Sequence, residues 1–370
     1  MVQGGAEGSV REREAVDYHG RPPRAPRCPP HHPVAVLPVF RLLKRLFLLG
    51  LLLTVAAGGG VLWWLERPLP LSSEAPLLVE VPPGSSARSV AQRLSRAGVQ
   101  LPAPLLEAWF RLSGQAQDIK AGIYEVPEGT TPRTLLQRLV SGEQALFSVQ
   151  IIEGWTFRQA LDALRRQPDL TPDLQGLTDA QVMQLIGRPG IHPEGRFFPD
   201  TYRVPRKAPA SSVLRQAAAA MDTQLARAWA QKAPDSPLKS PEDALILASI
   251  VEKETGLASD RPEIAGVFSN RLRIGMRLQT DPTVIYGLGD RFDGNLRRIH
   301  LDTDGPYNTY TRAGLPPTPI ALPGQASLLA AVQPKATRAL YFVARGDGSS
   351  QFSASLDEHN AAVRRFILNR

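Results

Sequence analysis

The sequence predicts an α+β protein that is preceded by a single N-terminal transmembrane helix. Residues 46–65 carry no charge, and a run of this length can cross the hydrocarbon core of a bilayer. Beyond it, short strand-like segments alternate with helical ones across Pro- and Gly-rich turns, a pattern that favours an α+β domain. The single cysteine, Cys28, lies ahead of the run. Packing rather than disulfides must therefore hold the rest together, which a chain of this length can manage.

Residues 1–40 are rich in Pro, Gly and Arg and show no hydrophobic periodicity, so we expect a disordered tail. His31 and His32 in this tail have no cysteine or acidic partner at metal-ligand spacing, and no histidine of the chain forms an H-E-x-x-H arrangement. We therefore expect no metal site.

The apolar run 46–65 is predicted to be a retained anchor. Trp63 and Trp64 stand at its far edge, where interfacial aromatic residues are expected. Basic residues gather before the run, whereas the charges just after it nearly cancel, so the positive-inside rule leaves the N-terminus in the cytoplasm and exports the bulk of the chain. A cleaved signal peptide is the alternative, but the run is long and no small-x-small cleavage site follows closely.

The formal net charge of the chain is +8, and the exported part carries a mild, widely spread share of it. So weak a basic excess gives no support to nucleic-acid binding. Solubility explains it, and attraction to an anionic wall polymer is a second explanation.

An internal repeat follows the anchor. Residues 79–94 align without gaps on residues 124–139 with half of the positions identical, and residues 153–164 are a shorter echo. Each unit predicts a strand, a Pro/Gly turn and a helix that begins at a hydroxyl cap. The three predicted caps are Ser86, Thr131 and Thr156.

The patterns in the middle and at the end of the chain predict helices and strands, and they single out no candidate catalytic residue. Residues 165–240 are rich in Ala, Arg and Gln and predict helices that pack beneath a cleft. Residues 339–344 form an apolar run that predicts a buried strand, and a Gly-Asp-Gly turn joins it to residues 350–353. Together these two segments predict a terminal hairpin.

The most informative segment predicts a buried helix that ends in two acids. Ser240 is a hydroxyl cap and Pro241 takes the first helical position, both of which are typical of a helix start. Residues 244–251 are apolar except for one serine, so the helix is expected to be buried on most sides. Glu252 and Glu254 follow directly.

Glu254 is the candidate general acid. At helical spacing it shares a face with Leu247, Ile250 and Val251. Desolvation against this face and the negative end of the helix dipole would both raise its pKa, as an acid working near neutrality needs. Glu252, on another face, is the rival candidate, and a solvated helix end without chemistry is the third interpretation.

Polar groups that can hold a sugar follow this helix. Gln279 offers a donor and an acceptor, Thr280 a hydroxyl and Asp281 a pure acceptor. Further on, Tyr307 and Asn308 begin a run that alternates aromatic faces with amide and hydroxyl groups. Carbohydrates combine apolar ring faces with hydroxyl rims, so this lining and a neutral-prone acid together predict glycosidic-bond chemistry.

The sequence resembles the membrane-anchored endolytic murein transglycosylases, the MltG or YceG-like family, over residues 77–365. Residues 194–202 fit the family's E-G-x-x-x-P-D-T-aromatic stretch. Arg196 stands where some relatives carry an aromatic residue, so this position lacks the ring on which a sugar could stack. The other matching runs are residues 248–287, 307–310 and 314–317 and the pair His359 and Asn360.

The resemblance implies a domain organisation and a location. Residues 77–145 would form a LysM-like subdomain, which either binds glycan or only acts as a spacer. Residues 146–370 would form the catalytic domain, placed in the periplasm by a single-pass anchor in the inner membrane.

The resemblance also implies a reaction in which Glu254, the second acid of the family's E-K-E run, protonates the oxygen between N-acetylmuramic acid and N-acetylglucosamine. The resulting carboxylate then accepts the proton of the muramic C6 hydroxyl as that oxygen attacks C1, giving a 1,6-anhydro end without water or a cofactor. One carboxyl group suffices because the nucleophile belongs to the substrate, unlike the usual glycosidase pair. The residues expected to position the sugars are Gln279, Thr280, Asp281, Tyr307 and Asn308.

The implied partners are peptidoglycan glycan strands, the membrane and the peptidoglycan synthases of nascent wall, whose strand length the enzyme would limit. Two alternatives stay open. One is a muramidase-like hydrolase of the same polymer, with Asp281 as base or nucleophile. The other is a non-catalytic wall-binding scaffold that works through its LysM-like region.

Overall fold

The computed structural model describes residues 37–72 and 76–368. The predicted tail up to residue 36, with Cys28, His31 and His32, lies outside the described residues. The chain divides into two compact units, Met1–Trp64 and Leu65–Arg370.

The described part of the first unit is helix α1 (Leu37–Leu65), whose last residue is counted with the second unit. Within the described residues this is the one helix that is long and apolar enough to cross a membrane, with a candidate span of Phe40–Leu65 and a mean hydropathy of 2.1. It begins ahead of the predicted span 46–65, so residues 37–40 are helical and were wrongly assigned to the tail.

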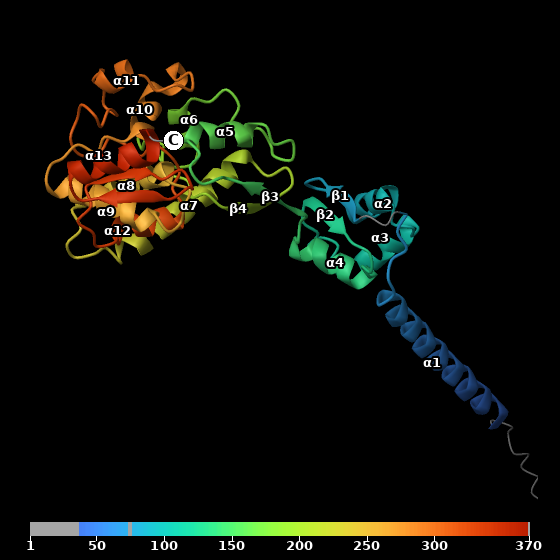
Figure 1. Cartoon of the computed structure of the whole chain (residues 1–370). Coiled ribbons are helices and arrows are strands. Elements are labelled where there is room, and N and C mark those ends of the chain that lie inside the picture. The colour runs from blue at the N-terminus through green and yellow to red at the C-terminus, as the bar shows by residue number, and fades with distance from the viewer. Residues whose placement is uncertain (1–36, 73–75, 369–370) are drawn as a thin grey trace, which may run out of the picture. The chain divides into compact units, whose positions relative to one another are not determined.

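The second unit starts with a β–α–α–β arrangement, followed by one more helix (Figure 1). The two strands pair antiparallel, with Leu77 opposite Val126 and Val81 opposite Gly122. Apolar side chains such as Phe110 and Tyr124 fill the core between the strands and the helices. The elements are β1 (Leu77–Val81), α2 (Ala87–Ala97), α3 (Ala103–Leu112), β2 (Gly122–Val126) and α4 (Pro132–Ser141).

The repeated strand–turn–helix units are confirmed. All three predicted caps accept a hydrogen bond from the backbone N–H three residues on, at the starts of α2, α4 and α5 (Phe157–Arg165). The turn before each helix has a glycine at positive φ, where a side chain would be strained. These glycines are Gly84, Gly129 and Gly154, with φ of 74°, 82° and 75°.

The third strand–turn–helix repeat, with β3 and α5, begins the larger part of the Leu65–Arg370 unit. Its strand β3 pairs antiparallel with β4, which lies inside residues 165–240, a region predicted to be helical. That prediction was wrong for β4, because the segment is short and alternates buried Tyr202 and Val204 with exposed residues. Phe157 and Phe197 stack at 5.3 Å in this core. The elements are β3 (Leu146–Gln150), α6 (Asp179–Leu185), β4 (Thr201–Pro205) and α7 (Ala210–Trp229).

Helix α8 (Pro241–Glu254) runs through the second core of this part. Ser240 caps it by accepting from the N–H of Asp243, and every residue from 244 to 251 is buried, as predicted. Four helices pack against it: α7, α9 (Arg261–Arg273), α10 (Asp281–Leu288) and α12 (Gln325–Val332). The following elements are α9 (Arg261–Arg273), α10 (Asp281–Leu288), η1 (Gly289–Arg291), α11 (Arg298–Asp302) and α12 (Gln325–Val332).

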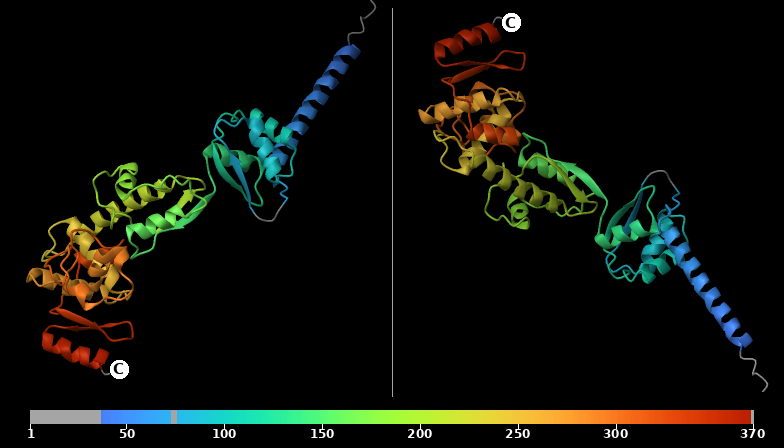
Figure 2. Two further views of the ribbon diagram at one scale, coloured as in Figure 1. Left: turned by 90° about the horizontal axis from the view of Figure 1, so that it is seen from above. Right: turned by 90° about the horizontal axis from the view of Figure 1, so that it is seen from below.

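The C-terminal hairpin is confirmed, with Tyr341 opposite Ser353. Its first strand, β5 (Tyr341–Ala344), is only half-buried, so the prediction of a buried strand was wrong. One face covers α9, where Phe342 meets Phe268 edge-on at 5.9 Å, and α13 (Leu356–Val363) packs beside it (Figure 2). In the part of the chain that the structure describes, strands form three two-stranded antiparallel sheets among many helices, so the α+β class holds. The last elements are β5 (Tyr341–Ala344), β6 (Ser350–Ser353), α13 (Leu356–Val363) and η2 (Arg364–Leu368).

Candidate active site

Glu254 is the last residue of α8. Its Oε1 accepts a hydrogen bond from the hydroxyl of Thr280, a residue that is 2% exposed. Among the residues described, Thr280 is its one recorded hydrogen-bond partner. The acid is therefore not a solvated helix end.

The surroundings of Glu254 raise its pKa. Burial is the largest cause, because it disfavours the charged carboxylate, and the negative charge of Asp281 acts in the same direction. The hydroxyl of Thr280 and the charge of Arg271 lower the pKa and so limit the rise. A carboxyl group in this setting keeps its proton at higher pH than a solvated one, as the sequence predicted.

Glu252, the rival candidate, has a structural role, because both of its carboxylate oxygens are bound by other parts of the chain. Its side chain is 5% exposed, its Oε2 accepts the backbone N–H of Gly324 at 2.9 Å, and Arg261 Nη2 lies 3.4 Å from its Oε1. Both oxygens are thus held by donors from other elements. Glu252 ties the end of α8 to the start of α12 and the start of α9.

A hydroxyl network holds Thr280 in place. Gln279 adopts a positive φ of 49° and donates its N–H to the carbonyl of Thr309 at 3.1 Å, which leaves its side chain exposed. The N–H of Thr280 donates to Thr309 Oγ1 at 3.0 Å, and Thr309 Oγ1 lies 2.9 Å from Thr283 Oγ1. This network fixes the hydroxyl that bonds Glu254.

Asp281 stands beside the acid at the first position of α10. It is exposed, and Oδ1 accepts the hydroxyl of Tyr310 at 2.5 Å. Burial and the neighbouring Asp281 raise the pKa of Tyr310, so its hydroxyl stays protonated as a donor. Of the predicted residues, Thr280 thus bonds Glu254, Asp281 acts on it through its charge, and Gln279 directly precedes Thr280.

Asn308 and Tyr307 have different surroundings. The amide nitrogen of Asn308 donates to the carbonyls of His300, Leu301 and Thr303, and its oxygen accepts the N–H of Tyr310 at 2.9 Å. The amide therefore organises its own loop. Tyr307 bonds Thr318 through its hydroxyl at 2.8 Å and meets Tyr286 edge-on at 5.0 Å.

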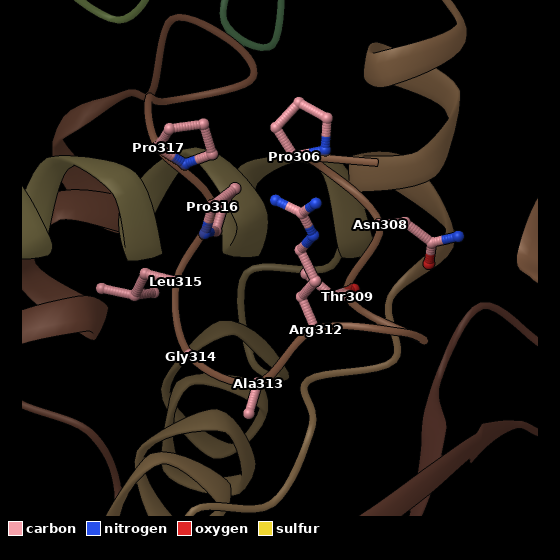
Figure 3. Close-up of a pocket in the computed structure, with 9 residues that line it drawn as sticks. All are labelled: Pro306, Asn308, Thr309, Arg312, Ala313, Gly314, Leu315, Pro316 and Pro317. Atoms are coloured by element: carbon pink, nitrogen blue, oxygen red, sulfur yellow. The ribbon is translucent and has the colours of Figure 1, made fainter. Parts of the chain in front are cut away.

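The same loop encloses a small pocket of about 230 Å³ (Figure 3). The guanidinium of Arg312 points between Pro306 and Pro316 in this view, and Arg312 is paired with Asp304 at 2.8 Å. The prolines and this ion pair stiffen the loop that carries Asn308.

The chain matches the YceG-like family over residues 79–365. It belongs to that family. A Bacillus subtilis relative named endolytic murein transglycosylase is 30% identical over 339 residues, which cover 85% of this chain and 91% of the relative. A Streptococcus pneumoniae protein of the same name is 27% identical, and the match covers 63% of its length. The crystal structure of a yceG-like protein from Listeria monocytogenes, 30% identical, superposes with a TM-score of 0.50 over 78% of this chain and 99% of that one.

Arg271 is a site residue of this YceG-like chain that the sequence reasoning missed. Its guanidinium is buried, donates from Nε to the carbonyl of Leu340 at 2.7 Å and from Nη1 to that of Leu278 at 2.5 Å, and lies 5.4 Å from the ring centre of Tyr341. It joins the terminal hairpin to the segment before Thr280. Its place in the Asn-Arg-Leu-Arg segment, inside the matching run 248–287, was the available signal.

Glu194 is a second carboxyl group whose setting went unnoticed. It is 4% exposed, and its Oε1 accepts the backbone N–H of Phe157 at 2.9 Å. Burial raises its pKa to about 7, although the N–H of Phe157 and the hydroxyl of Tyr286 oppose the rise. The Glu-Gly-Arg-Phe-Phe-Pro-Asp stretch marked this position without revealing its burial.

Proposed function

We propose that the chain is an endolytic lytic transglycosylase that cleaves bonds between N-acetylmuramic acid and N-acetylglucosamine within peptidoglycan strands. The observation that carries the proposal is the carboxyl of Glu254, which is desolvated at the end of α8 and bonded to one hydroxyl. Relatives in the YceG-like family that are named endolytic murein transglycosylases support the same reaction.

The reaction needs a group that gives a proton and takes one back. Protonated Glu254 donates to the glycosidic oxygen as the bond from that oxygen to muramic C1 breaks. The C6 hydroxyl oxygen of the same muramic unit then bonds to C1, and its proton passes to the Glu254 carboxylate. The products are a 1,6-anhydro end and a free hydroxyl on N-acetylglucosamine, and Glu254 is protonated again.

The neighbours of Glu254 suit both halves of this cycle. Burial favours the protonated acid before the first transfer. The hydroxyl of Thr280 stabilises the carboxylate that exists between the two transfers. A fixed donor is worth most at a charge that develops during the reaction, because it needs no reorganisation.

The remaining predicted residues would position the sugar chain. The exposed side chain of Gln279 and the Asp281–Tyr310 pair offer hydrogen-bonding groups beside the acid. The ring of Tyr307 offers an apolar face, and Asn308 acts through the loop that its amide organises.

The anchor and the N-terminal subdomain extend the proposal. Helix α1 would hold the enzyme in the inner membrane with its N-terminus in the cytoplasm and its catalytic part in the periplasm. Residues 77–145, with their β–α–α–β order, would form the LysM-like region, and glycan binding there would help to hold the strand. Peptidoglycan synthases are the proposed partners at nascent wall, where cleavage would limit strand length.

Mass spectrometry of the products from purified sacculi tests this function. The full-length chain in detergent should release fragments with 1,6-anhydro ends, and Glu254→Gln should release none above background. Reducing ends would instead support the hydrolase, with Asp281 as the second carboxylate. Intact sacculi, with binding alone, would support the non-catalytic scaffold.

A further inference from the structure

Helix α3, in the subdomain that follows the anchor, leaves part of its apolar surface uncovered. Leu106 and Phe110 are buried in the core of the subdomain. Leu105 is 43% exposed, and Leu112 is 85% exposed, more than any other large apolar side chain in the described part of the chain. Contiguous exposed apolar surface marks a place where another body makes contact.

The uncovered side chains lie on one face of α3. Leu105, Trp109 and Leu112 are four and three residues apart, a spacing that places them in a row along the helix. We call this row the α3 stripe. The two charged residues of α3, Glu107 and Arg111, pair with each other at 2.8 Å on a different face. The α3 stripe itself therefore carries no charge.

The α3 stripe lies close to the point where the chain leaves the candidate membrane span. Leu65 is the last residue of that span. Glu66 follows and pairs with Arg133 of α4 at 2.9 Å. The indole Nε1 of Trp109 donates to the carbonyl of Pro132 at 3.1 Å, and Pro132 directly precedes Arg133. One ion pair and one hydrogen bond thus connect the first residue after the span with the centre of the α3 stripe.

The connection after the span is too short to carry this subdomain away from a bilayer. Leu69 already belongs to the subdomain core, and its N–H donates to the carbonyl of Thr130 at 2.7 Å. It stands four residues after Leu65, and a chain of this length spans at most about 14 Å when fully extended. Where α1 crosses a bilayer, the subdomain must therefore lie at the headgroup region.

We propose that the α3 stripe is a membrane-contact face, which enters the bilayer surface beside the anchor. The inference rests on the anchor of the proposed function, and the partner that it names is lipid at the boundary between headgroups and acyl chains. Leucine and tryptophan side chains suit this boundary. The indole N–H of Trp109 already has an acceptor in Pro132, so no unbonded donor enters the lipid. This contact would hold the LysM-like region at the membrane surface.

Quenching of a fluorescent label by brominated lipid tests the contact without requiring cleavage. The full-length chain with Cys28→Ser lacks its single cysteine and receives one new cysteine at a time for an environment-sensitive dye. Each labelled chain is reconstituted into vesicles of equal parts phosphatidylcholine and phosphatidylglycerol. The phosphatidylcholine is either unmodified or brominated on the upper part of its acyl chains.

Three positions carry the dye. Leu112→Cys reports the α3 stripe, and Leu62→Cys reports the far end of α1 as the positive control. Leu78→Cys is the matched control in the same subdomain: it is 48% exposed on β1 and alternates with the buried residues that face the core. We expect brominated lipid to quench the dye at residues 112 and 62 and to leave the dye at residue 78 unquenched.

Leu105→Glu, in the chain labelled at residue 112, should weaken the contact. The ratio of molecules with the stripe in lipid to those without should fall about tenfold or more, because a charge replaces a buried leucine. An acid in the first turn of a helix is tolerated, so α3 should stay folded. Leu356→Glu is the matched control, since Leu356 is 54% exposed in the first turn of α13, and it should leave quenching unchanged. Thermal unfolding checks that both variants are folded.

Two results would overturn the membrane-contact face: quenching at residue 112 no stronger than at residue 78, or quenching that folded Leu105→Glu leaves undiminished. In the first case, a blue shift of the dye at residue 112 would place a protein surface, such as a second copy of the chain, over the stripe. A dye at residue 62 that is not quenched would remove the anchor and the contact with it. A chain that is quenched at residue 112 yet gives no anhydro products keeps the membrane-contact face and loses the transglycosylase.

Discussion

Glu252 and Glu254 both lie on the last turn of α8, but the groups around their carboxylates differ. Glu252 is bound on both oxygens, by the backbone N–H of Gly324 and by Arg261. Glu254 is partly buried and is bonded by a hydroxyl instead, and its pKa is raised. A carboxylate that is bound by a cation and a backbone amide has a structural role. One that is desolvated without such partners can hold and exchange a proton.

Replacing Glu254 should have the largest effect. Glu254→Gln keeps the shape of the side chain and removes the proton that must be given and taken back. Release of anhydro fragments should fall about 10²–10⁴-fold or more, as expected for a positioned acid–base group. Product analysis on sacculi at equal amounts of folded protein measures the loss.

Stability of the Glu254→Gln protein should be equal to that of the wild type at acid pH and greater at alkaline pH. The folded-state pKa of Glu254 is raised, so the native protein holds a proton that the unfolded chain has already released. Wild-type stability therefore declines as pH rises through that pKa, and the amide variant escapes this decline. Wild-type cleavage by the folded variant would move the acid elsewhere.

Glu194 extends the comparison to a third carboxyl group. Its pKa rises from the ordinary 4.5 to about 7, and this interval corresponds to about 3 kcal/mol at about 1.4 kcal/mol per tenfold change in proton affinity. The stabilising protonated state is fully present below pH 4.5 and is lost as pH rises through about 7.

Glu194→Gln should remove this pH dependence. Its amide oxygen can still accept the N–H of Phe157. Urea unfolding of variant and wild type should give similar stabilities at pH 4 and a gap in favour of the variant that opens between pH 5 and pH 8. A constant gap across this range would show that Glu194 does not titrate there.

Glu252→Gln should affect stability more than chemistry. The variant keeps an oxygen for the N–H of Gly324 but removes the negative charge that faces Arg261. We expect the free energy of unfolding to fall by about 1–3 kcal/mol. Glu153 also interacts with Arg261 and so compensates for part of the lost charge. Activity per folded molecule should stay within about tenfold of wild type, as a group without proton transfer requires. A loss as large as that of Glu254→Gln would make Glu252 the acid.

Local sequence rules predicted the parts of the fold that depend on neighbouring residues. The cap at Ser240 and the apolar run behind it specified α8 and its burial. Ser86, Thr131 and Thr156 specified three helix starts, because a hydroxyl cap acts on an N–H only three residues away.

The same rules preferred Glu254 to Glu252 only by its helical face, because the groups that distinguish the two acids come from distant segments. Gly324 binds one acid and Thr280 binds the other. Arg271 was missed for the same reason, since its acceptors at Leu278 and Leu340 meet only in the folded chain. Hydrogen bonds between elements are decided by packing, which single-sequence patterns do not encode.

Thr280→Val should change the pH profile more than the maximal rate. The hydroxyl favours the ionised form of Glu254, so its loss should raise the pKa of the acid further. The alkaline limb of kcat/KM should then move to higher pH, because the acid keeps its proton longer. Thr283→Val is the matched control, since its hydroxyl bonds Thr280 and Thr309 rather than Glu254. Equal shifts in both variants would trace the change to the loop and not to the hydrogen bond.

Asp281→Asn should have the smallest effect, and it should move the profile in the opposite direction. The negative charge of Asp281 raises the pKa of Glu254, so its removal should lower that pKa and shift the alkaline limb of kcat/KM to lower pH. The asparagine oxygen can still accept from Tyr310, which preserves the local geometry. Turnover to 1,6-anhydro products should continue, because the nucleophile is the substrate's own hydroxyl. A two-carboxylate hydrolase would lose nearly all activity with this change, so the end groups of the fragments that the variant releases decide between the two mechanisms.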